Sequence, residues 1–138
     1  VQAVSTAEVP KFTILIGASH GAGNYAMCGR AYGPRFLFTW PNARISVMGA
    51  QQAAQVLVTV KEQQRTREKA TLGDDERRRI TEATLRQYEQ EGSPYFSSAR
   101  LWDDGILDPV DTRLVLGFCL DLAAAAPVKE SRAPVFRM

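Results

Sequence analysis

The chain has 138 residues, of which 45% are hydrophobic and 23% are charged, and 17 basic and 15 acidic side chains leave a net charge of +2. This is the composition of an ordinary globular domain, and it excludes disordered, collagen-like and coiled-coil chains. A domain of this length can bury a core without help from a disulfide or a metal. The only long charge-free stretch, residues 12–29, contains Gly, Ser, His and Asn, so it is a poor membrane-spanning helix.

Strands and helices alternate along the first half of the chain. An apolar, β-rich run ending at Gly17 predicts a strand buried on both faces, and a Gly-rich turn follows it at residues 18–23. Pro41 and Asn42 indicate a turn between two further strands. The strands are expected at residues 12–17, 36–40 and 44–48, and the helices at residues 24–32 and 50–69.

The second half is mostly helical. Asp74 is placed to cap a charged helix, in which acids precede bases by four residues and indicate a solvated face rather than a nucleic-acid surface. Ser93 and Pro94 begin the next helix. Further elements are expected as a helix at 95–102, a turn at 103–105, a minimal strand at 106–107 and a last helix at 111–126. This order predicts an α/β domain.

Carboxylates are distributed unevenly. Glu8 is followed by no Asp or Glu until Glu62, whereas Lys11, Arg30 and Arg35 fall inside this gap. A segment without carboxylates supplies neither an acid/base pair nor a hard-metal site, but it could hold an anion. Burial of the segment in the core is the commoner explanation for missing charges.

The two cysteines lie outside any CxxC pattern, so no zinc site or disulfide framework is indicated and a reducing compartment is the default.

The Gly-rich turn at Gly21–Gly23 is the candidate site. Amides at a helix start have no partner inside the helix and point outward, so they can hold an anion or a developing oxyanion. A tight turn needed only for packing is an equally good interpretation of this spacing. The residues also fit G-x-G-x-x-A, the dinucleotide fingerprint, but the acidic residue that should hold a ribose hydroxyl is missing.

Other reactive side chains have simpler interpretations. His20 is the only histidine, and a hydrogen-bonding or packing role is favoured over that of a general base because no orienting partner is evident. Cys28 is expected to be a small buried residue. Asp103 and Asp104, beside Gly105, are explained by turn formation.

The chain resembles the carboxyltransferase subunits of biotin-dependent acyl-CoA carboxylases, and within that family the β subunits of 3-methylcrotonyl-CoA carboxylases. Ordered runs along nearly the whole sequence carry the resemblance. They are Gly21–Tyr25, Met27–Tyr32, Pro34–Leu37, Trp40–Gly49, Gln52–Ala54, Ser93–Gly105, Asp108–Gly117 and Phe136–Met138. His20 replaces the family's usual aromatic residue, and Ala50-Gln51 replace the commoner Gly-Glu.

The resemblance implies a crotonase-like (ClpP/crotonase) ββα superhelix, of which residues 1–138 would be the C-terminal part of the carboxyltransferase C-domain. It implies transfer of a carboxyl group from carboxybiotin to 3-methylcrotonyl-CoA, giving 3-methylglutaconyl-CoA, at a site between two β subunits. Biotin would be carried by the partner α subunit, and no metal is expected. Geranyl-CoA or another acyl-CoA is the alternative substrate. The expected location is the mitochondrial matrix or a bacterial cytoplasm.

Site residues follow by the same resemblance. The backbone amides of Ala22 and Gly23 would form the oxyanion hole for the ureido oxygen of biotin. His20, Gly21, Asn24 and Tyr25 would lie around the cofactor, with Tyr25 shaping the acyl pocket. A second hypothesis treats the last helix, with Leu114 and Phe118, as an oligomerisation surface. Nucleotide binding by the Gly-rich turn is the third.

Overall fold

The structure is a computed structural model that describes residues 1–127, so the predicted family run at Phe136–Met138 lies outside the described residues. Short 3₁₀ turns, η1 (Arg30–Tyr32) and η2 (Pro109–Asp111), connect the main elements. The helices are α1 (Gln2–Thr6), α2 (Gly21–Ala26), α3 (Ala50–Arg67), α4 (Asp74–Glu91), α5 (Pro94–Ser98) and α6 (Thr112–Ala124). The strands are β1 (Phe12–Leu15), β2 (Ala18–His20), β3 (Phe36–Thr39) and β4 (Arg44–Ser46).

Two consecutive ββα units form the centre of the fold. The first consists of β1, β2 and α2, and the second of β3, β4 and α3. Equivalent strands pair in parallel between the units: β1 pairs with β3 so that Phe12 faces Phe36, and β2 pairs with β4 so that His20 faces Ser46. Each unit therefore contributes one strand to each of two small sheets, which is the repeating ββα arrangement that the family resemblance implies.

A third step of the repeat begins at Ile106. This residue forms a parallel bridge with Thr39 of β3, and Leu107 donates its amide hydrogen to the Thr39 carbonyl over 2.8 Å. The predicted minimal strand at residues 106–107 is thus present as one bridge. Because Thr39 is only 2% exposed, the ladder runs through the core at this point.

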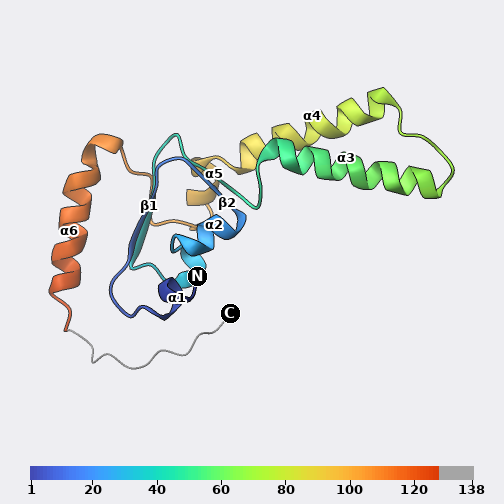
Figure 1. Cartoon of the computed structure of the whole chain (residues 1–138). Coiled ribbons are helices and arrows are strands. Elements are labelled where there is room, and N and C mark those ends of the chain that lie inside the picture. The colour runs from blue at the N-terminus through green and yellow to red at the C-terminus, as the bar shows by residue number, and fades with distance from the viewer. Residues whose placement is uncertain (128–138) are drawn as a thin grey trace.

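The chain folds into a body and an arm. α3 and α4 run side by side and project away from the strands, whereas α6 lies on the opposite side of the body (Figure 1). The arm returns to the body at Gly92, whose carbonyl accepts a hydrogen bond from the Ile45 amide over 3.1 Å. A Cβ at Gly92 would lie 2.6 Å from the Tyr88 carbonyl oxygen, so this junction requires glycine. The end of α4 is thereby fixed beside β4.

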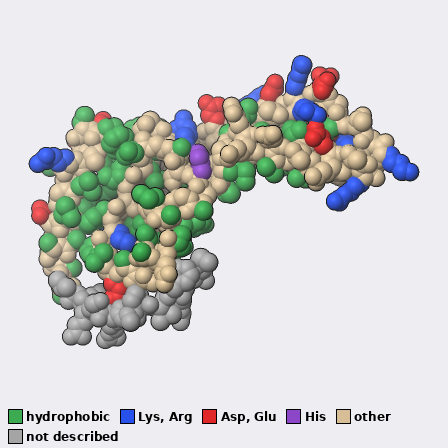
Figure 2. Space-filling model, in the orientation of Figure 1, with side chains coloured by type: hydrophobic (Ala, Val, Ile, Leu, Met, Phe, Trp, Pro, Cys, Tyr) green, Lys and Arg blue, Asp and Glu red, His purple; other side chains and the backbone are tan. Residues whose placement is uncertain are grey.

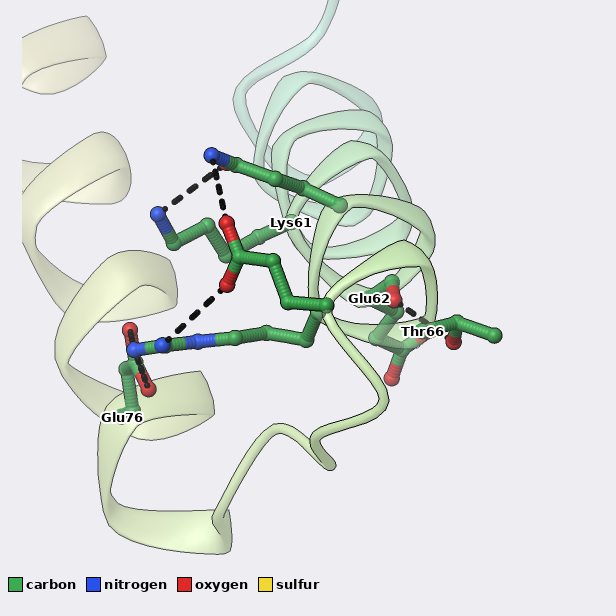
Figure 3. Close-up of polar contacts among 7 residues, drawn as sticks. Lys61, Glu62, Thr66 and Glu76 are labelled. Atoms are coloured by element: carbon green, nitrogen blue, oxygen red, sulfur yellow. Dashed lines mark hydrogen bonds and ion pairs between the residues drawn. The ribbon is translucent and has the colours of Figure 1, made fainter.

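Charged pairs connect the two helices of the arm. Arg65 of α3 bonds to both carboxylate oxygens of Glu76 of α4 over 3.1 Å, and Arg77 of α4 pairs with Glu62 of α3. Figure 3 shows Lys61, Glu62 and Thr66 on α3, with Glu76 on the neighbouring helix. Ion pairs this exposed contribute little free energy, so they set the register of the two helices more than the stability.

Much apolar surface remains outside the core. Hydrophobic side chains gather over the body and along one side of the arm (Figure 2). The core itself is small, and its members are Cys28, Leu37, Ala43, Ala53, Ala54, Val58, Leu107 and Cys119. None of the helices within residues 1–127 combines the length and hydropathy needed to cross a bilayer.

Several sequence predictions need correction. Residues 18–20, expected as a turn, form β2, and the helix expected at 24–32 begins earlier at Gly21 and stops at Ala26. It stops because Cys28 adopts φ +61°, which an α-helix does not allow. The strand expected to be buried on both faces is only partly covered, and Ile16 is 57% exposed.

The helix ends also differ from the predictions. Gly73, not Asp74, caps α4, and Asp74 is its first helical residue. The helix after Ser93 begins at Pro94 as predicted, but α5 ends at Ser98, four residues before the predicted end at Trp102. The last helix, predicted at 111–126, is α6 and is shorter by one residue at its start and two at its end.

Candidate functional site

The predicted Gly-rich turn is a direct junction between β2 and α2. Gly21 has φ +51°, in the left-handed region that favours glycine. A Cβ built on Gly21 would lie 2.7 Å from the Val47 carbonyl oxygen, closer than real contacts allow. The backbone that follows β4 therefore packs directly on the first residue of α2. Only glycine fits here, so the spacing in the sequence reflects a real close approach.

The first backbone amides of α2 have no hydrogen-bond partner within the helix. Ala22 and Gly23 occupy its second and third positions, where an amide has no carbonyl partner inside the helix. The small side chains leave these donors uncovered, and no carboxylate lies in the first turn of α2. Such donors are suited to a negatively charged oxygen.

A cleft of about 650 Å³ lies against this junction. Four of the six predicted site residues line it, namely Gly21, Ala22, Asn24 and Tyr25. His20 instead lines a neighbouring cleft of about 490 Å³, and Gly23 lines neither of the two. The structure thus brings most of the predicted residues together around one cavity.

His20 is held by a serine that the sequence did not single out. Its Nδ1 lies 2.8 Å from Ser46 Oγ, and Ser46 Oγ donates to the Met48 carbonyl over 2.6 Å. Because the single hydroxyl hydrogen of Ser46 goes to Met48, the hydrogen of the first contact must come from His20 Nδ1. The predicted hydrogen-bonding role of His20 is confirmed, and it connects the end of β2 to β4.

Asn24 and Tyr25 are both anchored. Asn24 Nδ2 donates to Ser19 Oγ over 3.1 Å, and the Asn24 carbonyl accepts from the Gly29 amide over 2.7 Å. The Tyr25 ring meets the edge of Tyr32 at a centroid distance of 5.8 Å, while the side chain as a whole remains 48% exposed. Tyr25 therefore presents a supported aromatic surface to the cleft.

Distant segments complete the cleft, and sequence reasoning missed them. Arg30 forms a salt bridge with Asp104 over 3.1 Å, and its Nε donates to the Trp102 carbonyl over 3.1 Å. Leu101 and Trp102 follow α5, and Tyr88 comes from the end of α4. No sequence signal pairs Arg30 with residues more than seventy positions away. The only hint in the sequence was the presence of basic residues such as Arg30 in a segment without carboxylates.

The predicted turn chemistry of the two aspartates is confirmed. Asp103, 5% exposed, accepts hydrogen bonds from Ser97 Oγ and from the Gly105 amide, each over 3.1 Å. Asp104 Oδ2 accepts from the Leu37 amide over 2.7 Å. Cys28, as predicted, is buried. Within residues 1–127 no three His, Cys, Asp or Glu side chains are grouped so that they could hold a metal ion.

Comparison with known proteins gives consistent matches. The carboxyl transferase domain family matches residues 1–138. Over its whole length the chain is 56% identical to the β1 subunit of biotin-dependent 3-methylcrotonyl-coenzyme A carboxylase of Mycobacterium tuberculosis, covering 26% of that protein. It is 54% identical, again over its whole length, to the mitochondrial methylcrotonoyl-CoA carboxylase β chain of Arabidopsis thaliana, covering 24% of it.

Solved structures agree. The β subunit of P. aeruginosa geranyl-CoA carboxylase superposes with a TM-score of 0.81 at 41% identity, covering 99% of this chain and 26% of that one. Transcarboxylase 12S gives a TM-score of 0.71 at 30% identity over 96% of this chain and 25% of its own. These neighbours confirm the predicted crotonase-like fold. The chain spans about a quarter of the length of the relatives that it matches.

Proposed function

Because this chain belongs to the carboxyl transferase domain family, we propose that it is part of the β subunit of a 3-methylcrotonyl-CoA carboxylase. The whole subunit would transfer a carboxyl group from carboxybiotin to 3-methylcrotonyl-CoA, giving 3-methylglutaconyl-CoA. Residues 1–138 would be the C-terminal part of its C-domain. The proposal is supported by the Gly21 junction, where Ala22 at the start of α2 is one of the residues that line a cleft.

The residues present fit a cofactor of this kind. Biotin, when bound, would supply the carboxyl group and its own base, so the protein has to provide orientation and charge stabilisation. The amides of Ala22 and Gly23 supply hydrogen-bond donors for an oxyanion, and the first turn of α2 has no carboxylate to repel it. Removing one such donor costs about 3 kcal/mol of transition-state stabilisation in other oxyanion holes.

The neighbouring residues would position these amides. Gly21 allows the close approach of the Val47 carbonyl, and Asn24 fixes the first helical turn through Ser19. His20 and Ser46 hold β2 against β4. Tyr25 would contact the acyl group or the cofactor from inside the cleft.

The proposed partners are a biotin-carrying α subunit, further β subunits and an acyl-CoA. Two relatives are described as β chains or subunits of carboxylases, and the transcarboxylase 12S structure is described as a hexamer assembly. The mitochondrial matrix and a bacterial cytoplasm are both proposed locations, because the relatives include a mitochondrial and a bacterial protein.

Replacing Ala22 by Pro tests the proposed oxyanion hole. In the full-length subunit, assembled with its α subunit, Ala22→Pro should abolish carboxyl transfer without disrupting assembly, because proline has no amide hydrogen and is tolerated in a first helical turn. The assay measures bicarbonate-dependent carboxylation of 3-methylcrotonyl-CoA. Asp75→Pro is the matched control, since it removes the amide at the same position of α4, in the arm. Normal turnover by a correctly assembled Ala22→Pro enzyme would contradict the assignment.

Exposed apolar side chains on α6 favour a second role, in subunit assembly. Leu114 is 75% exposed and Phe118 is 62% exposed, one turn apart on α6. Two large apolar side chains exposed on the same face of a helix are typical of a protein interface. We therefore also propose that α6 contacts another part of the assembled enzyme.

A further inference from the structure

Leu101 has an unusual backbone conformation at the cleft. Its φ is +59°, in the left-handed region that a branched side chain rarely adopts. It lies three residues after the end of α5, in the turn that closes the helix. Helices often end with glycine at such a place because glycine enters this region without strain. Leucine is therefore less favourable than glycine at this position.

The surroundings hold this conformation on both sides. The Leu101 amide donates to the Ser98 carbonyl over 3.0 Å, and the Trp102 amide donates to the Ser97 carbonyl over 3.1 Å. The next carbonyl, that of Trp102, accepts from Arg30 Nε. Buried Asp103 then fixes the following turn through Ser97 and Gly105. Strained conformations persist where neighbours determine them in this way, and they are common at ligand sites.

The Leu101 side chain contributes almost nothing to the packing of the described chain. It is 82% exposed, yet it lines the same cleft as Ala22 and Tyr25. Trp102 lines the cleft as well, with 44% of its surface exposed and its ring in a T-shaped contact with Phe96. The left-handed conformation and the exposed apolar surface of Leu101 both cost stability in the described chain, which spans about a quarter of the length of its relatives.

We propose that Leu101, together with Trp102 and Tyr25, forms an apolar wall that contacts the acyl group of the acyl-CoA and sets the preference among acyl chains. This inference rests on the proposed function. The acyl chain is the better occupant because it is hydrocarbon and needs no hydrogen bonds. A ureido ring requires donors and acceptors, which the Leu101 side chain does not have.

Leu101→Gly in the full-length subunit, assembled with its α subunit, tests the proposal. The variant should lower kcat/KM for 3-methylcrotonyl-CoA about tenfold, chiefly through KM, which is the scale on which lost hydrocarbon contacts act. Its thermal midpoint should not fall, because glycine relieves the strain. Leu101→Met should keep kcat/KM within about twofold of the parent, because it keeps the apolar volume.

Lys69→Gly is the matched control. Lys69 also has positive φ, +56°, and it is exposed in the connection between α3 and α4, away from the cleft. The same relief of strain is expected there, with no change in KM.

Binding of acyl-CoA can be measured independently of carboxyl transfer. By calorimetry, 3-methylcrotonyl-CoA should bind Leu101→Gly about tenfold more weakly than the parent, while coenzyme A without an acyl group should bind both equally. Equal affinity of parent and variant for the acyl-CoA would overturn the role of Leu101. So would dissociation of the Leu101→Gly assembly, which would identify Leu101 as an interface residue. A parent enzyme that binds but carboxylates no acyl-CoA would instead contradict the proposed function.

Discussion

Gly21 is the residue on which the geometry of the junction depends most. A methyl group there would meet the Val47 carbonyl oxygen at 2.7 Å, and the φ of +51° is unfavourable for any other residue. We expect Gly21→Ala to lower the free energy of unfolding of the full-length subunit by about 1–2 kcal/mol from the conformation alone. Urea denaturation measures this loss, and carboxylation activity should fall with it because the amides are displaced.

Gly17→Ala provides the control for Gly21. Gly17 has no positive φ, and an added Cβ would have no atom within 4 Å. The stability of this variant should stay close to that of the parent. If Gly21→Ala proved as stable and as active as Gly17→Ala, the close approach of Val47 to α2 would be wrong.

Some site residues could be recognised from the sequence and others could not. The glycines and small residues of the site were recognisable because close backbone approach restricts side-chain size locally. Ser46, which fixes the tautomer of His20, was not recognisable, because the contact depends on the parallel register of β2 with β4. The conformation of Leu101 could not be predicted for a related reason: leucine rarely adopts a left-handed backbone, so its presence in the sequence does not indicate one.

Among the helices and strands, α6 gives the clearest test of how the subunits assemble. Replacing Leu114 and Phe118 together by Ser removes two exposed apolar side chains, 75% and 62% accessible, without touching the buried Cys119 on the same helix. Analytical ultracentrifugation of the full-length subunit should then show a smaller assembly. Any activity that remains should show an unchanged KM for the acyl-CoA.

Arg113→Ser is the control on the same helix, since Arg113 is exposed and polar. It should leave the assembly intact. An unchanged sedimentation coefficient for the Leu114/Phe118 variant would exclude α6 as an interface.

Elements with strong periodicity were predicted well, and those defined by tertiary contacts were not. The helices α3 and α4 begin within one residue of their predicted starts, because apolar spacing and a glycine mark them locally. β2 has three residues and exists only through its pairing with β4, so no local pattern reveals it. The interruption after Ala26 likewise depends on one backbone angle, at Cys28.

At the scale of the whole molecule, alternating strands and helices predicted an α/β domain, and the family runs predicted the ββα repeat that the structure shows. The arm was not predicted as such, because two charged helices could equally have packed on the body. The core is small and many apolar residues of the body are exposed, so we expect other surfaces of the full-length subunit or of its partners to cover them.

We propose that the full-length subunit carboxylates 3-methylcrotonyl-CoA. The most direct measurement is the incorporation of labelled bicarbonate into acid-stable product by the subunit assembled with its biotinylated α subunit, with 3-methylcrotonyl-CoA and geranyl-CoA compared at equal concentrations. We predict biotin-dependent labelling, with a higher kcat/KM for 3-methylcrotonyl-CoA. A higher kcat/KM for geranyl-CoA would contradict the substrate assignment, and no labelling with either acyl-CoA would show that the subunit is not a carboxyltransferase for these substrates.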